Sequence, residues 1–490
     1  MNEHTFDQEE RQLTRQSLRR HFLTRTSAGL GVAALSQLLN AQDAPPRLSP
    51  ESHPGTATRT HFIPRAKRVI YLFMSGGPSH VDLFDPKPRL KSMHGQEMPE
   101  SVRASRRVTT MTRTQSSFPC AGSPYKFQPH GAAGIELSEI LPHHSRIADH
   151  LCVVRSMWSE TINHDPAVTL MQTGSGNAGR PCMGSWLSYG LGSENQNLPT
   201  FIVLLSGVTF GQPVLSRYWH SGFLPSQHQG VQFRSTGDPV LFLSNPPGVN
   251  QDDRGKVIRT VNQFNQMRLK EIGDPEIEAR IQAFELAYRM QTSVPDLIDL
   301  STETQETLDL YGVQPGQTSF AANCLLARRL VERGVPFVQL FHKDWDHHQN
   351  LPDKLPLLCK ETDKGSAALV LDLHRRGLLD DTLVIWGGEF GRTSYCQGKL
   401  TATDLGRDHH PHCFSLWMAG GGIRSGMTYG TTDEFGYTVA DKPVHVHDFQ
   451  ATVLHCLGID HTRLTFRFQG RNFRLTDVQG EVLRDLLSHV

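Results

Sequence analysis

Three well-separated stretches of this chain contain carboxylate or imidazole side chains next to an apolar run. They are Asp344-Trp345-Asp346-His347-His348, Gly387 to Thr393, and Gly406 to His412. The first two follow such a run and the third precedes one. These side chains are the ligands that divalent cations use in proteins. A solvated histidine-rich loop would explain any one stretch by itself. Three of them, in a chain with 25 histidines, favour a metal or anion site.

Within these stretches, particular residues have the spacing or setting that such a site requires. Asp344 and His348 are four residues apart and could turn toward one ion. Glu389 and Arg392 lie among three glycines, which suits close approach of an anionic ligand. Separately, His164 precedes a predicted helix that has Asp165 as its N-cap and Pro166 in its first turn, where backbone N–H groups attract anions.

The elements that must position these residues alternate between strand and helix. Helices are expected over 138–149, 166–174, 277–290, 318–333, 361–376 and 448–457. Strands are expected over 68–74, 151–157, 200–205, 335–341, 381–386 and 414–419. This order predicts an α/β fold with a central, mostly parallel sheet flanked by helices. Because function collects at the carboxyl ends of such strands, the three stretches should meet at one rim of the sheet.

Composition excludes some classes of protein. Lysine plus arginine equals aspartate plus glutamate at 49 each, so nothing favours a nucleic-acid partner. The hydrophobic content of 38% suits a globular chain with a sizeable core. Eight cysteines without a CxxC pair argue against a zinc ribbon. Buried free thiols are favoured, although one or two disulfides remain open if the compartment is oxidising.

The ends of the domain are also indicated. Residues 1–41 carry a twin-arginine signature, Arg19-Arg20-His21-Phe22-Leu23, before a weakly apolar run too short for a stable transmembrane helix. This predicts export to the periplasm or cell envelope, with the twin-arginine machinery as a transient partner. Residues 42–65 are expected to form a flexible linker. Residues 66–490 form the predicted domain, with an inserted cap at about 206–315.

The motifs together resemble an uncharacterised family of exported sulfatase-like proteins, known as domain of unknown function fifteen-oh-one, within the alkaline phosphatase and sulfatase superfamily. The resemblance covers the chain from about Lys67 onward. The motifs that carry it are FMSGGPSHVDLFDPKP (Phe73 to Pro88), NHDPAVTLMQTG (Asn163 to Gly174), FELAYRMQ (Phe284 to Gln291), NCLLARRLVERGVPFVQL (Asn323 to Leu340), DWDHH (Asp344 to His348), GGEFGRT (Gly387 to Thr393) and GRDHHP (Gly406 to Pro411). It implies an alkaline-phosphatase-like sandwich.

Compared with the wider superfamily, the resemblance implies one cation site made by Asp344, His348 and His409. Glu389 stands where the superfamily has the Asp of its DHG motif, and is expected to be a ligand or a general base. Phe390 replaces that motif's second ligand and Ser75 replaces a first-strand Asp, so a second metal site is degraded. His164 takes the place of the nucleophile, as a nucleophile itself or as a fourth ligand. Further candidates for the site are Ser75, His80, Asp82, His347, Asp408 and His412.

The expected activity is metal-dependent hydrolysis of sulfate or phosphate esters, with Arg392 holding the anionic head group. The ion would be divalent, with Zn or Mn suiting the ligands better than Ca. The substrate would be an anionic ester, either a small molecule or a sulfated or phosphorylated polymer. The alternatives are a catalytically degenerate binding protein that kept one cation, and a structural protein of the cell envelope.

Overall fold

The computed structural model describes residues 60–103, 108–206, 214–234, 239–240, 243–245 and 248–488. The predicted export signal, residues 1–41, and most of the predicted linker lie outside these residues. The described end of that linker is hydrogen-bonded to the domain. The backbone N–H groups of His61 and Phe62 donate to the Gly458 carbonyl at 2.7 and 3.0 Å.

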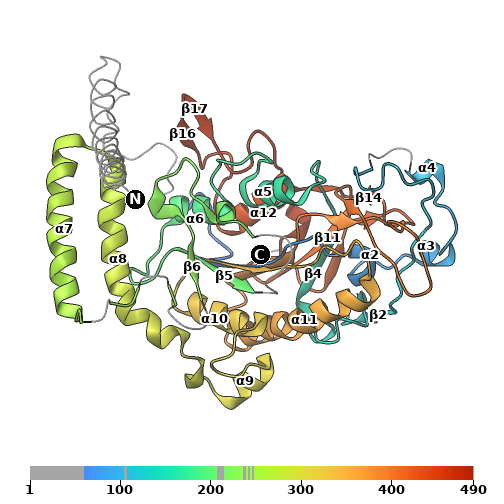
Figure 1. Ribbon diagram of the computed structural model, residues 1–490, viewed down its shortest axis with the longest axis horizontal. Helices are drawn as coiled ribbons and strands as arrows, with labels where there is room; N and C mark the ends of the chain where they lie inside the picture. Colours follow the sequence, from blue (N-terminus) through green and yellow to red (C-terminus); the bar gives the residue numbers. More distant parts are fainter. Residues whose placement is uncertain are drawn as a thin grey trace, which may run out of the picture. The chain divides into compact units, whose positions relative to one another are not determined.

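A nine-stranded sheet forms the centre of the domain (Figure 1). Its order is β12 (Met427–Tyr429), β4 (Leu151–Trp158), β11 (Phe414–Ala419), β8 (Thr382–Gly387), β1 (Arg68–Met74), β7 (Phe337–His342), β5 (Phe201–Ser206) and β6 (Val231–Phe233), and β15 (Val444–His445) pairs with β4. Only β11 runs antiparallel to its sheet neighbours. The mostly parallel sheet expected from the sequence is therefore confirmed.

Helices cover both faces of the sheet, as Figure 1 shows. On one face lie α5 (His164–Thr173), α6 (Met183–Leu191) and α12 (Val446–Cys456), which share a core with Val69, Tyr71 and Phe73 of β1. On the other face lie α9 (Gln305–Tyr311), α10 (Phe320–Glu332) and α11 (Leu351–Arg375), around the alternate residues Ile70, Leu72 and Met74. Because β1 is covered on both faces, its whole sequence is apolar after Arg68.

The region expected to form an inserted cap is only partly separate from the sheet. Within it, β6 adds a parallel strand to the edge of β5. The region also contains two long paired helices, α7 (Gln251–Ile272) and α8 (Pro275–Ile298), which Figure 1 shows side by side. The apolar spacing in the sequence predicted the second of these helices but not the first.

The predicted helix over 138–149 is wrong. The chain there forms β3 (Ile135–Ser138), paired with β2 (Phe127–His130), and then a 3₁₀ helix over His144–His150. Asp363 accepts hydrogen bonds from the His143 and His144 backbone N–H groups at 2.7 and 2.9 Å. These bonds replace the regular α-helical pattern.

Each of the eight cysteines falls in the described part of the chain and is a buried free thiol. The expectation of buried thiols is thus confirmed. Among the described helices, none combines the length and the apolar character needed to cross a membrane.

Candidate metal centre

Four side chains from three regions of the chain converge past the carboxyl ends of the central strands. His164, Asp346, His348 and His409 each offer one ligand atom, and these atoms lie within 4.8 Å of one another. His164 begins α5, Asp346 and His348 follow β7, and His409 lies in the short strand β10 (His409–His410). The sequence predicted that distant stretches would meet at one rim of the sheet, and these four residues do so.

The carboxylate in this cluster is Asp346 and not the predicted Asp344. Asp344 has a positive φ of 76°, which turns the chain as it leaves β7. Beyond it the residues alternate: Trp345 and His347 are buried, while Asp346 and His348 are partly exposed. In an extended segment, residues two apart point to the same side, whereas a spacing of four brings side chains together only in a helix. Asp344 therefore lies outside the cluster.

Each of the three imidazoles turns its Nε2 toward the Asp346 carboxylate. The distances are 2.8 Å from His348 Nε2 to Oδ1, 3.3 Å from His409 Nε2 to Oδ1, and 3.2 Å from His164 Nε2 to Oδ2. The four side chains are between 6 and 22% exposed. The cluster is thus largely buried but open to solvent on the side of His348.

The opposite nitrogen of each ring faces an oxygen. His409 Nδ1 is 2.9 Å from the Ile162 carbonyl, His164 Nδ1 is 2.6 Å from Glu389 Oε1, and His348 Nδ1 is 2.5 Å from Gln397 Oε1. A carbonyl or carboxylate oxygen only accepts, so Nδ1 carries the proton in each ring. Such contacts fix the ring orientation and leave Nε2 as the atom that could bind a metal.

This arrangement fits a cation. Burial lowers the pKa of His409 to about 4, although hydrogen bonding to Asp346 opposes the shift, so its ring is neutral near pH 7. Its unprotonated Nε2 then faces the carboxylate of Asp346, and both atoms are acceptors. A divalent ion between them would convert that repulsion into two ligand bonds. At ligand distances of about 2.0–2.2 Å the atoms around a tetrahedral ion lie about 3.3–3.6 Å apart. The contacts of 2.8–3.3 Å with Asp346 would therefore lengthen slightly, and the widest separation in the cluster, up to 4.8 Å, would shorten.

The charges around the cluster also hold Asp346 ionised. Burial by itself would raise the pKa of Asp346, but the Arg392 guanidinium and the contacts with the three histidine rings hold it well below its usual range. Burial likewise opposes protonation of His164, yet its contacts with Asp346 and Glu389 raise its pKa. Without metal, protonated His164 supplies a positive charge between these two carboxylates.

Arg392 holds the loops of the site together, which corrects its expected role as the binder of an anionic head group. Its Nη2 lies 2.6 Å from Asp346 Oδ1 and also contacts the Gly76 carbonyl. Its Nε donates to the Gly77 carbonyl at 2.8 Å and its Nη1 to the Arg407 carbonyl at 3.2 Å. Arg392 is only 1% exposed, and its N–H groups donate to other parts of the protein. They are therefore not available to bind an anionic head group.

Glu389 supports the cluster from behind. It is fully buried, and besides the His164 ring it accepts a hydrogen bond from the Gly76 backbone N–H at 2.9 Å. It is not one of the four converging side chains. In this position Glu389 can orient the His164 ring and accept a proton from it. Of the two roles expected from the sequence, ligand or general base, the position fits the second better.

Two glycines allow the loop after β1 to approach this closely. Gly76 has φ 119°, and a Cβ there would lie 2.7 Å from the Asp346 backbone nitrogen. Gly77 has φ 71°, and a Cβ there would lie 2.6 Å from the ring of Phe390. That ring packs against both His164 and His409, at 4.9 and 4.7 Å between centroids. Phe390 thus fills the place of a ligand with an apolar wall.

The further candidates from the sequence lie around the cluster and are outside its four converging side chains. His80 Nε2 is bonded to the Gly436 carbonyl at 2.9 Å, and Asp82 receives Arg407 Nε at 2.7 Å. Asp408 accepts from the His409 backbone N–H at 2.8 Å and so helps to place the ligand beside it. The remaining candidates are Ser75 and His347, which are buried, and His412, whose ring makes an edge-to-face contact with His410.

The start of α5 differs from its prediction, and it is paired with an arginine side chain that the sequence did not mark as part of the site. Its N-cap is Asn163, and Asp165 is the second helical residue. The Asp165 carboxylate pairs with Arg217 and accepts from the Tyr218 hydroxyl at 2.9 Å. Arg217 is 41% exposed. Arg217 lies in a region rich in Gly, Pro, Gln and Ser, a composition that indicated only a loop. No motif in the sequence therefore pointed to this arginine.

Comparisons with solved structures give weak overall similarity. A protein in the alkaline phosphatase superfamily from Vibrio parahaemolyticus has 11% identity and a TM-score of 0.35, covering 82% of this chain and 68% of that one. PsFucS1 sulfatase from Pseudoalteromonas sp. has 13% identity and a TM-score of 0.31, covering 81% and 68%. Alkaline phosphatase from the Antarctic bacterium TAB5 has 11% identity and a TM-score of 0.30, covering 74% and 95%.

A comparison with curated protein sequences gave no match. The sequence of residues 66–487 matches one family model over nearly the whole domain, in agreement with the motifs quoted above. The chain belongs to the family described as "Protein of unknown function (DUF1501)".

Proposed function

We propose that this protein is a metal-dependent hydrolase of sulfate or phosphate esters. The observation that carries the proposal is the orientation of three imidazoles. Each has its Nδ1 bonded to an oxygen and its Nε2 turned to the one carboxylate of Asp346. The ester class comes from the resemblance of the motifs to the sulfatase and phosphatase superfamily.

His164, Asp346, His348 and His409 would hold the ion. Imidazole and carboxylate ligands suit Zn or Mn. A bound divalent cation would polarise an ester oxygen and lower the pKa of a water molecule. His164 and Glu389 form the part of the site that can accept a proton: the ring shares its Nδ1 proton with Glu389 at 2.6 Å.

Arg217 is the residue we assign to the anionic substrate, in place of Arg392. It is partly exposed, and its partner Asp165 is the next residue after His164. The helical turn that carries it packs on the carboxyl end of β7, where Trp219 lies 5.8 Å from Phe341 between ring centroids. A guanidinium in this position can bind a sulfate or phosphate group through two N–H donors.

A second function is favoured by one specific observation. Arg392 is fully engaged and four protein side chains converge, which resembles a closed structural site more than an open catalytic one. A binding or structural protein that retained one cation would have this geometry.

An ester panel separates the two. Purified protein loaded with Zn²⁺ or Mn²⁺ is assayed on an aryl sulfate, a phosphate monoester and a phosphodiester, beside the His409→Ala variant. Turnover by the wild type that His409→Ala loses while remaining folded supports the hydrolase. Tight metal binding without turnover on any ester supports the binding protein.

We also propose that the protein is exported through the twin-arginine route, on the motif Arg19-Arg20-His21-Phe22-Leu23. Fusion of residues 1–60 to a reporter that is scored in the periplasm tests this. Replacing both arginines by lysine should retain the reporter inside the cell. Unchanged export of that variant would contradict the proposal.

A further inference from the structure

The outer face of α7 exposes a stripe of large apolar side chains. The exposed fractions are 55% for Val257, 36% for Val261, 66% for Phe264, 63% for Met267 and 54% for Ile272. At 100° per residue these positions fall within an arc of about 140° on one side of the helix. Isolated exposed apolar residues are ordinary, but a contiguous stripe of five marks a contact surface.

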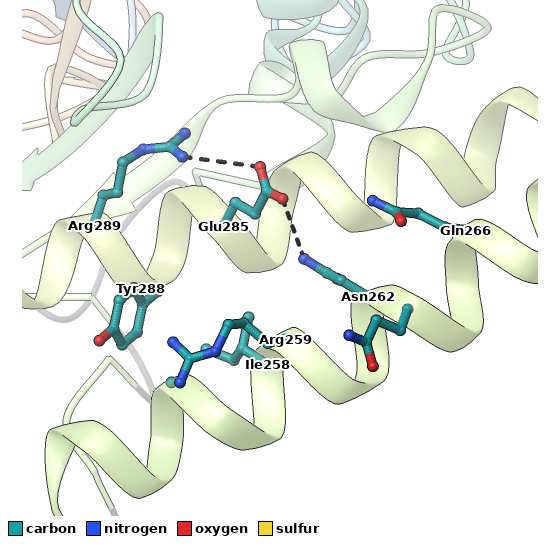
Figure 2. Close-up of a pocket in the computed structure, with 9 residues that line it drawn as sticks. Ile258, Arg259, Asn262, Gln266, Glu285, Tyr288 and Arg289 are labelled. Carbon is teal, nitrogen blue, oxygen red and sulfur yellow. Dashed lines mark hydrogen bonds and ion pairs between the residues drawn. The ribbon is translucent and has the colours of Figure 1, made fainter.

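The stripe is separate from the face that α7 uses inside the domain. Gly255, Ile258 and Asn262 are buried against α8, and the partly buried Asn265 and Leu269 continue that line. Figure 2 shows polar side chains of both helices around a cavity of about 310 Å³ between them, with Glu285 bonded to Asn262 and Arg289. The inner contact is therefore made, and the outer stripe is available to a partner.

The charges on α7 indicate which partner fits. On the side of the stripe, Asp253 and Arg254 lie near its N-terminal end, and Arg268 and Glu271 near its C-terminal end. Two antiparallel copies of this helix would place acidic residues of each beside basic residues of the other. A lipid surface fits less well, because the charged residues within the arc of the stripe are balanced, with two basic (254 and 268) and two acidic (253 and 271). Interfacial helices are instead rich in lysine and arginine.

We propose that α7 is a self-association surface, on which two copies of the chain pair antiparallel to form a four-helix bundle from two α7–α8 hairpins. A two-fold axis between residues 260 and 261 places Val257 opposite Phe264 of the second copy and Asp253 opposite Arg268 of the second copy. Such an isologous contact is the commonest symmetry in homo-oligomers, and antiparallel helix pairs are the ordinary packing of bundles.

Light scattering coupled to size exclusion measures the outcome on the chain from residue 42 onward. The wild type is expected to be a dimer and Phe264→Glu a monomer with an unchanged circular dichroism spectrum. Val478→Glu is the matched control, since Val478 is 73% exposed and lies far along the chain from α7; it should remain dimeric. A wild type that is monomeric at all concentrations, or a Phe264→Glu variant that remains dimeric, would overturn the proposal.

Cross-linking tests the register. The native cysteines are buried, so a short bismaleimide reagent reacts chiefly with an introduced one. Val261→Cys, beside the axis, should give a covalent dimer. Gln251→Cys should not, because the two copies of that residue would be about 28 Å apart along the helix. Equal cross-linking of both variants would refute the antiparallel register, and binding of the monomer to phosphatidylglycerol vesicles without a dimer in solution would assign the stripe to lipid.

Discussion

Arg392 Nη2 lies 2.6 Å from Asp346 Oδ1, and this pair joins the cluster to the loops around it. The same guanidinium donates to the backbone of the loop after β1, through Gly77, and to Arg407 before β10. One buried side chain therefore fixes three of the loops that carry or support the ligands. The charge of Arg392 also keeps Asp346 ionised when no cation is bound.

Arg392→Ala should destabilise the protein by about 3–5 kcal/mol, because it leaves a largely buried carboxylate unpaired and several carbonyls without donors. Arg392→Lys should recover little of this, since a lysine cannot reproduce the planar fork of donors. Urea unfolding of the metal-free protein measures both changes.

Arg217→Ala is the matched control for that loss. Arg217 is partly exposed, and its removal should change the free energy of unfolding by no more than about 0.5 kcal/mol. If the protein hydrolyses an ester, this variant should raise KM for the anionic substrate with a smaller effect on kcat. A large loss of stability in Arg217→Ala, or none in Arg392→Ala, would reverse the roles assigned to the two arginines.

Gln397→Leu should weaken metal binding by about 10- to 100-fold, because the Gln397 side chain holds His348 Nδ1 and so fixes the ring that binds. Competition with a chelating dye measures the affinity. Gln266→Leu is the control: Gln266 lies in the cavity between α7 and α8, and its replacement should leave the affinity unchanged. Equal affinities for Gln397→Leu and the wild type would show that His348 does not depend on this contact.

The stability of the metal-free protein should rise with pH between about 4 and 6.5. Burial lowers the pKa of His228 to about 4, against about 6.5 in the unfolded chain. In that window the unfolded state binds more protons than the folded state, so the free energy of unfolding increases with pH, by up to about 1.4 kcal/mol per pH unit for this one group. Urea titrations at several pH values measure the slope, and His228→Gln should reduce it. A slope that His228→Gln leaves unchanged would contradict the assignment.

The sheet was predictable because its strands are continuous apolar runs. Arg68–Met74 and Phe414–Ala419 have the predicted bounds, since full burial on both faces leaves a clear signal in the residues. The rim was predictable for the same reason, because each cluster of ligands directly follows or precedes such a run. His348 and His409, which the structure places in the cluster, were therefore marked as candidates by the sequence. His164 was marked instead by its position before a predicted helix and by the family resemblance.

The choice between Asp344 and Asp346 was not predictable from spacing. It depends on the left-handed φ of Asp344 and on the extended chain that follows it, neither of which has a reliable sequence signal. The role of Arg392 was missed because its partners are mostly backbone carbonyls, which carry no side-chain identity. Helix α7 was missed because its buried face is mostly glycine and asparagine, with only Ile258 and Leu269 as large apolar residues, while most of its apolar side chains lie on the exposed face. The single apolar face expected of a surface helix is therefore absent from the sequence pattern.

Isothermal titration of Zn²⁺ and Mn²⁺ into the wild type, Asp346→Asn and Asp344→Asn tests the metal centre most directly. We predict one ion per chain for the wild type, an affinity lower by about 100-fold or more for Asp346→Asn, and a change of less than about 3-fold for Asp344→Asn. Absence of tight binding by the wild type, or an Asp344→Asn variant that loses the ion while Asp346→Asn keeps it, would contradict the account.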